Sequence, residues 1–153
     1  MKITGYRNTY ADADLNTADT DYYDLVQYKY DGMFIVVIID GLSCELYTRS
    51  GRLYDRVILE MPQPKTVFVG ELLRGTQRSK QLRGNKIMGF DVQHAWGEDV
   101  SRRNYLQRMD ALAFSTLPVE FLEHYEVERV ATASAKEEMA NHWQVVKFAD
   151  LEG

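Results

Sequence analysis

The chain has 153 residues, of which 45% are hydrophobic and 27% charged, a composition typical of one folded domain with its own core. A formal net charge of −5 excludes attraction of the whole molecule to nucleic acid, and a single cysteine, Cys44, excludes an internal disulfide and a thiolate metal cluster. Because no apolar run reaches membrane-spanning length and no signal-peptide core follows Met1, we expect an intracellular, cytoplasmic protein without membrane partners.

The first half of the chain is predicted to be a meander of strands after an irregular lead-in at residues 5–21. The stretches that alternate or carry β-branched and aromatic runs are Leu25–Tyr30, Phe34–Ile39, Ser43–Arg49, Arg52–Leu59 and Thr66–Leu73. Asp40-Gly41 predicts a two-residue hairpin turn, and Ser50-Gly51 predicts a second turn. Pro62 and Pro64 are expected to close the meander, since neither can donate to an interior ladder.

The second half is predicted to add helices. The elements expected after a basic, glycine-punctuated loop at 74–86 are a strand at Ile87–Val92, a helix from an N-cap at Ser101 to about Phe114, a strand at Tyr125–Thr132 and a helix from Ser134 to about Val145. Pro118 is expected to stop the first helix. The pattern predicts one α+β domain over residues 1–153, with mainly antiparallel sheets and flanking helices.

The stretch Lys29-Tyr30-Asp31-Gly32 lies directly before the apolar run Met33–Ile39. A lysine at the mouth of a buried strand, with a carboxylate and then a glycine close behind, suits an amine nucleophile whose ligand must approach the backbone. Taken alone, the pattern is equally typical of a strand end followed by a turn. Glu71 is a second candidate, because a carboxylate inside an apolar strand is costly to bury unless it is bonded or faces a cleft.

Five short segments, which include these two candidates, follow one another along the sequence. The segments are Lys29-Tyr30-Asp31-Gly32, Thr48-Arg49-Ser50-Gly51, Val69-Gly70-Glu71-Leu72, Phe90-Asp91-Val92 and Leu151-Glu152-Gly153. Together they resemble motifs of the covalent nucleotidyltransferase superfamily, which comprises ATP-dependent DNA and RNA ligases and messenger-RNA capping enzymes. The resemblance implies a ligase-type, ATP-grasp-like adenylation domain that is incomplete at its C-terminus.

The resemblance implies that Lys29 is the catalytic nucleophile and becomes linked to a nucleoside monophosphate, with release of pyrophosphate. ATP is the expected substrate, GTP the less favoured one, and Mg²⁺ the expected cofactor. The lysine must react as the free amine, which desolvation against apolar strands favours. The expected partners are a nucleoside triphosphate and nicked or broken DNA or RNA.

The same resemblance implies roles in nucleotide binding for the residues around Lys29. Gln27 stands where ligases often read the adenine edge, although an ordinary polar strand residue is an equal alternative. Tyr28, Asp31 and Gly32 are also expected beside the nucleotide, and the alternative for Tyr28 is packing on the sheet.

Four later residues complete the implied site. Arg49 would hold a ribose hydroxyl or a phosphate, and its alternative is a solvated turn arginine. Glu71 would bond the ribose or help to hold metal, with Glu152 as a second metal-side carboxylate. Phe90 would stack on the base, and its alternative is a plain core aromatic.

Two departures from the family pattern shape the expectations. Phe34 stands where ligases and capping enzymes commonly place an arginine, which favours RNA-ligase-like relatives. The sequence stops at Glu152-Gly153, before the fourth-motif lysine, the fifth motif and any oligonucleotide-binding-fold domain, segments that a longer chain would supply. We therefore expect poor self-nucleotidylation, and the alternative function is a non-catalytic, ligase-derived module that binds a nucleotide or nucleic acid or serves as a structural partner.

Overall fold

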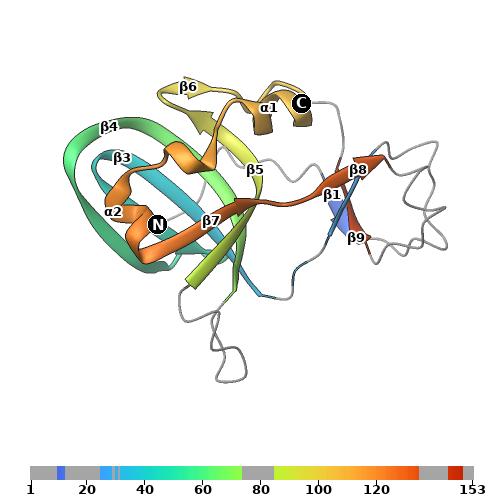
Figure 1. The fold of residues 1–153 in the computed structure, drawn as a ribbon, viewed down its shortest axis with the longest axis horizontal. Coiled ribbons are helices and arrows are strands. Elements are labelled where there is room, and N and C mark those ends of the chain that lie inside the picture. Colours follow the sequence, from blue (N-terminus) through green and yellow to red (C-terminus); the bar gives the residue numbers. More distant parts are fainter. Residues whose placement is uncertain are drawn as a thin grey trace.

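The fold was obtained as a computed structural model, which describes residues 10–12, 25–28, 30, 32–73, 85–134 and 145–149. Within these residues the chain forms two sheets and three short helical segments (Figure 1). The large sheet contains β3 (Met33–Thr48), β4 (Leu53–Leu73), β5 (Asn85–Ala95) and β6 (Glu98–Asp99) in antiparallel order, with β7 (Tyr125–Arg129) parallel to β5. The small sheet is antiparallel, in the order β1 (Tyr10–Asp12), β9 (Val145–Ala149), β2 (Leu25–Tyr28) and β8 (Thr132–Ser134).

The expected α+β class, with its ligase-type domain, is wrong for the described residues. Strand predominates, and the helical segments are only α1 (Tyr105–Asp110), the 3₁₀ turn η1 (Phe114–Thr116) and α2 (Val119–His124). Helices of this length cannot form a layer of their own. The molecule is a small domain dominated by antiparallel sheet, in which the helical segments cover part of one sheet.

The hairpin expected at Asp40-Gly41 does not form, because β3 runs through it without interruption. Both halves of β3 pair with the same neighbour, β4, and the register shifts around Gly41. Gly41 has a φ of +61°, so its backbone bends the strand where other residues would be strained. The turn at Ser50-Gly51 is confirmed, with the Gly51 amide donating to the Thr48 carbonyl over 2.9 Å.

The two prolines expected to close the meander lie inside β4 instead. Pro62 and Pro64 are exposed and precede Val67, the first residue of β4 that pairs with β5. No N–H is required from β4 toward β5 before that point, so proline is tolerated. The strands predicted at Arg52–Leu59 and Thr66–Leu73 are therefore one strand, β4, which continues through both prolines.

The ends of the predicted helices differ from those in the structure. Helix α1 begins after an N-cap at Asn104, not Ser101, and Asn104 forms a capping box with Gln107. The helix ends at Asp110, and Pro118 is the N-cap of α2 instead of the stop of the earlier helix. The strand expected at Tyr125–Thr132 is split between β7 and β8.

The helix predicted from Ser134 lies mostly outside the described residues. Ser134 itself ends β8 and Val145 begins β9, so both predicted ends are strand residues. The loop at 74–86 is described only from Asn85, where β5 begins.

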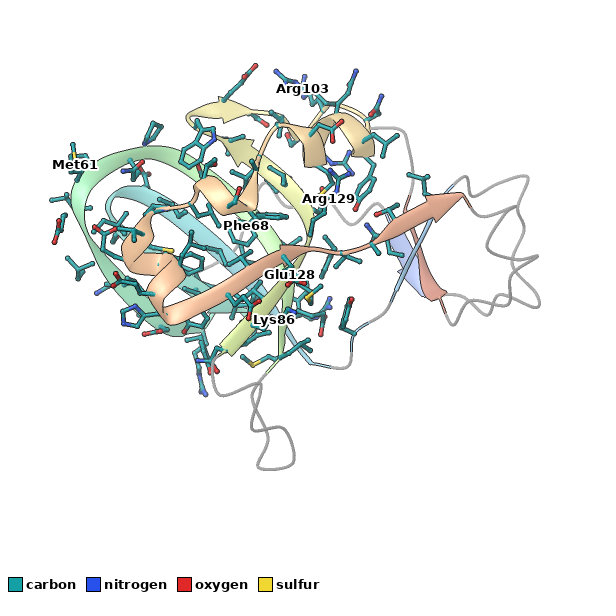
Figure 2. All side chains as sticks on the ribbon, viewed as in Figure 1. Met61, Phe68, Lys86, Arg103, Glu128 and Arg129 are labelled. Carbon is teal, nitrogen blue, oxygen red and sulfur yellow. The ribbon has the colours of Figure 1, made fainter. Side chains whose placement is uncertain are left out.

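The main core lies between one face of the large sheet and the helical segments. The Phe68 ring on β4 lies 5.1 Å from that of Phe114 in η1 and 6.5 Å from that of Phe121 in α2, measured between ring centroids. Figure 2 shows Phe68 beneath these helices, and on β5 and β7 the labelled Lys86 and Glu128, whose ion pair spans 3.1 Å.

Strand alternation places a second cluster on the opposite face of the large sheet. On β3, Ile35 and Val37 belong to the main core, whereas Phe34 and Val36 belong to the second cluster. The face that carries Phe34 is called the site face below. In the part of the chain that the structure describes, no helix has both the length and the apolar character needed to cross a membrane.

Candidate functional site

Several residues singled out in the sequence lie outside the described residues. They are Lys29, Asp31 and Glu152. Tyr28 is described only through its backbone, as the last residue of β2. The geometry therefore concerns Gln27, Gly32, Arg49, Glu71 and Phe90.

Glu71 and Phe90 share the site face with Phe34. Phe34 and Glu71 are opposite each other in the β3–β4 ladder, and residues in such a pair project to the same side. The Phe34 and Phe90 rings lie 6.1 Å apart between centroids, with 51° between their planes. The structure thus brings together a carboxylate and two aromatic rings from three neighbouring strands.

Arg49 joins this group although it follows the far end of β3. Its guanidinium carbon lies 4.2 Å from the centroid of the Phe34 ring, a cation–π contact. A straight strand of this length would separate Phe34 from Arg49 by about 50 Å. The bend of β3 at Gly41 therefore places Arg49 on the site face, where its guanidinium packs on the ring of Phe34.

A β-bulge shapes the site face at Phe90. Val69 pairs with Asp91 and Gly70 pairs with Gly89, so Phe90 is an extra residue with no partner directly opposite on β4. The bulge lets two consecutive residues, Phe90 and Asp91, turn toward the site face. Phe90 is only 3% exposed, so its ring is also a packed member of the second cluster.

Asp91 forms a buried ion pair that sequence reasoning missed. Arg108 of α1 donates from Nε to the Asp91 carboxylate over 2.9 Å, and both side chains are fully buried. Arg108 also donates from a terminal nitrogen to the Arg103 carbonyl over 2.7 Å. The available signal was spacing, because Arg108 recurs at helical distance from the buried Tyr105 and Leu112.

Gln27 is buried, at 1% exposure, and connects the small sheet to α1. Its side-chain Nε2 donates to the hydroxyl of Tyr105. Its Oε1 has no hydrogen-bond partner among the described residues. Burial raises the pKa of Tyr105 well above its ordinary value, so this hydroxyl keeps its proton at neutral pH. Among the described residues, Gln27 Oε1 is therefore a buried acceptor to which no group donates.

Gly32 has a packing role of its own. A Cβ at this position would lie 2.5 Å from the Leu72 carbonyl oxygen and 2.8 Å from a methyl of Leu73. Glycine is thus needed for close approach to β4, whether or not a ligand also uses that space.

Of the two residues suggested for metal, Glu71 is described, and Glu152 lies outside the described residues. Within residues 25–28, 32–73 and 85–134, no group of three or more His, Cys, Asp or Glu side chains converges to hold a metal ion. Glu71 supplies one carboxylate to the site face. Mg²⁺ is commonly held by one or two carboxylates together with substrate phosphates, so one carboxylate fits a metal that arrives with a nucleotide.

Comparison with known proteins supports the fold only. No protein-family model matches the chain, and no curated protein matches it. It is similar to a solved structure named Pmar-Lig_PreS3, with a TM-score of 0.54, 13% identity and coverage of 85% of this chain and 39% of that one. A second, named Pmar-Lig_Pre., has a TM-score of 0.53 and 14% identity, with the same coverage. The chain thus spans 39% of the length of each of these two chains, and at such identity the likeness concerns the arrangement of strands and helices alone.

Proposed function

We propose that this chain is the nucleotide-binding core of an ATP-dependent polynucleotide ligase, acting on DNA or RNA, in which Lys29 forms a covalent lysyl-AMP intermediate. The observation that carries the proposal is the grouping of Arg49, Glu71 and Phe90 on one face of the large sheet. These residues come from three separate sequence motifs, and a common ligand is the simplest reason for their convergence.

The side chains of the site face suit the parts of a nucleotide. Arg49 offers a planar, permanently charged donor for a phosphate or a ribose hydroxyl. Glu71 offers an acceptor for ribose hydroxyls or a ligand for a metal carried by the phosphates. Stacking of the base on Phe90 requires the nucleotide to replace part of the packing between Phe90 and Phe34.

Gln27 favours adenine over guanine in this proposal. Its amide nitrogen donates to the Tyr105 hydroxyl, and its oxygen accepts no hydrogen bond from the described residues. The exocyclic amine of adenine is a donor, whereas the corresponding atom of guanine is an oxygen acceptor. ATP is accordingly the proposed substrate, and GTP the poorer one.

The proposed reaction is transfer of adenylate to an amine. The nitrogen of Lys29 attacks the α-phosphorus, a nitrogen–phosphorus bond forms, and the bond from that phosphorus to the bridging oxygen breaks. Pyrophosphate leaves with the electron pair, and the lysine nitrogen loses its proton to solvent. Bound Mg²⁺ would neutralise charge on the phosphates, and Glu71 is the residue of the site face whose carboxylate would act as its ligand. Since its substrates are ATP and polynucleotides, we place the protein inside the cell.

Intact mass spectrometry tests the proposal directly. After incubation with ATP and Mg²⁺, a small fraction of the chain should gain the mass of one adenylate, and Lys29→Ala should gain none. Because the fourth-motif lysine and the fifth motif are expected to assist this step, the same assay should be run on a chain extended through those segments. Absence of the adduct from both forms would overturn the catalytic proposal.

A non-catalytic module is the second candidate. The burial of Phe90 and the packing role of Gly32 show that two motif residues also serve the fold, which is compatible with their retention in a binding protein. This candidate predicts ATP binding without an adduct. Equilibrium binding of a non-hydrolysable ATP analogue, compared between the unaltered chain and Arg49→Ala, separates the two candidates from a chain that binds no nucleotide.

A further inference from the structure

We propose that Trp96, at the tip of the hairpin formed by β5 and β6, is a stacking platform for the bases of single-stranded nucleic acid. The proposal goes beyond the adenylation reaction, because binding at this turn requires neither ATP nor Lys29. It is carried by the exposure of the indole, by the left-handed backbone that presents it and by the cations beside it.

Trp96 occupies a turn position that tryptophan ordinarily avoids. Ala95 and Glu98 pair across the hairpin, so Trp96 and Gly97 form the loop between the strands. Their φ angles are +53° and +89°, the signs of a type I′ turn, for which Asn-Gly is the favoured sequence. Among the described residues, no other non-glycine residue has a positive φ. A bulky side chain in this region costs free energy, and such costs are concentrated at functional sites.

Hydrogen bonds to β4 fix this backbone conformation. The Trp96 N–H donates to Thr66 Oγ1 over 3.0 Å, and the Gly97 N–H donates to the Lys65 carbonyl over 2.8 Å. Thr66 is itself buried, and its Oγ1 donates to the Pro64 carbonyl over 3.3 Å. The turn is therefore held in place before any ligand binds, which lowers the entropic cost of presenting the ring. Trp96 remains 36% exposed, so its ring can be covered by a base.

The charges beside the turn favour a phosphate backbone. Lys65, whose carbonyl bonds the turn, and Arg102, in the turn that follows β6, are both exposed. The neighbouring carboxylates are engaged, because Glu98 pairs with Arg103 and Asp99 accepts from the amide and the hydroxyl of its own loop. Cations thus outnumber carboxylates around the indole, although the whole chain is acidic. An aromatic ring flanked by cations is the pattern by which proteins hold single strands.

A hollow adjoins the same cations. Arg103, which bonds Glu98 of the hairpin, also lines an open hollow of about 410 Å³ together with Gln107, Asp110 and Ala111 of α1. Figures 1 and 2 show β6 and the labelled Arg103 at the same end of the molecule. The hollow gives room for a nucleotide next to the stacked base.

Fluorescence anisotropy of a labelled oligothymidylate of about 12 nucleotides tests the proposal on the whole chain. The unaltered chain should bind the probe, and Trp96→Ala should weaken binding about fivefold to a hundredfold, whereas Trp96→Phe should keep most of the affinity. Lys65→Ala and Arg102→Ala should each weaken binding and reduce by about 0.7 the slope of log affinity against log salt concentration. An unlabelled oligouridylate competitor shows whether RNA is held as well as DNA.

Ile58→Ala is the matched control. Ile58 is also a large apolar residue and is 67% exposed, but it lies on β4 outside the hairpin, opposite Ser43 of β3. This variant should bind the probe as the unaltered chain does. The emission of Trp96 reports stacking directly once the other tryptophan is removed by Trp143→Phe, and it should be quenched as the oligonucleotide is added.

The outcomes separate the inference from the proposed function, because ATP binding is measured independently. The inference is overturned if the chain does not bind the probe, or if Trp96→Ala binds it as tightly as the unaltered chain. Displacement of the probe by a polyglutamate peptide as effectively as by unlabelled oligothymidylate would assign the surface to acidic polypeptides and overturn the inference as well. Should Trp143→Phe not fold, the anisotropy of Trp96→Ala and Trp96→Phe decides.

Discussion

The guanidinium of Arg108 and the carboxylate of Asp91 lie 2.9 Å apart with both side chains fully excluded from solvent. Such a pair contributes little net stability relative to apolar residues, yet removal of one partner leaves a buried charge uncompensated. Because Asp91 adjoins Phe90 and Arg108 shares α1 with Tyr105, the pair connects α1 to the site face. Its energetics can be measured separately from any activity.

Arg108→Met should lower the free energy of unfolding by about 3–5 kcal/mol, because Asp91 would remain buried without its counter-charge. The double variant Asp91→Leu with Arg108→Met should recover much of this loss. Urea denaturation measures both. Arg103→Met is the control, since Arg103 pairs with Glu98 on the surface and should cost about 1 kcal/mol or less. Equal losses for Arg103→Met and Arg108→Met would contradict the argument from burial.

Gly89→Ala should destabilise the protein by about 1–3 kcal/mol, because the added methyl would lie 2.5 Å from the ring of Phe114. The clash predicts partial rescue by Phe114→Leu, which makes room beside position 89. Thermal unfolding of the two single variants and the double variant tests this coupling. Strictly additive losses would show that the ring is not what excludes a side chain.

Cys44 should be unreactive toward iodoacetamide at neutral pH while the protein is folded. It is fully buried, and burial raises the pKa of its thiol well above the ordinary range, so the reactive thiolate is scarce. Mass spectrometry should show one alkylated site in urea and none under native conditions. Rapid native labelling would mean that β3 opens locally around residue 44.

The strands were predictable where the hydrophobic pattern is regular. Alternation at Cys44, Leu46 and Tyr47 assigned each side chain to the face on which it lies, and the apolar run at Thr66–Leu73 identified part of β4. The bend of β3 was not predictable, because Asp40-Gly41 satisfies the local requirements of a hairpin turn equally well. Only the pairing of both halves of β3 with β4 distinguishes a bent strand from a hairpin at this point.

The candidate site was predictable in part for a similar reason. Local motifs indicated Arg49, Glu71 and Phe90 as residues to examine, but not the bulge that turns Phe90 and Asp91 to the same side. The burial of Arg108 depends on a carboxylate from another strand, and the engagement of Gln27 depends on a tyrosine from a helix. Helical spacing could place Arg108 on the buried side of α1, but the identity of these long-range partners leaves no local signature in the sequence.

Phe34→Leu should weaken nucleotide binding by removing the aromatic platform beneath Arg49. The guanidinium carbon lies 4.2 Å from the ring centroid, and a cation–π contact at an exposed residue is worth about 0.5–1 kcal/mol, or about twofold to fivefold in affinity. Leucine keeps an apolar side chain against Phe90 while losing the π face. Titration with a non-hydrolysable ATP analogue measures the change.

Phe34→Tyr is the control for this prediction, because it retains the ring and should bind as the unaltered chain does. Arg49→Lys keeps the positive charge but loses the planar group that stacks, so it should resemble Phe34→Leu. If Phe34→Leu binds as tightly as Phe34→Tyr while Arg49→Ala is impaired, Arg49 acts without its platform. The bend at Gly41 would then matter only for delivering the charge, because the ring beneath it would contribute nothing to the ligand.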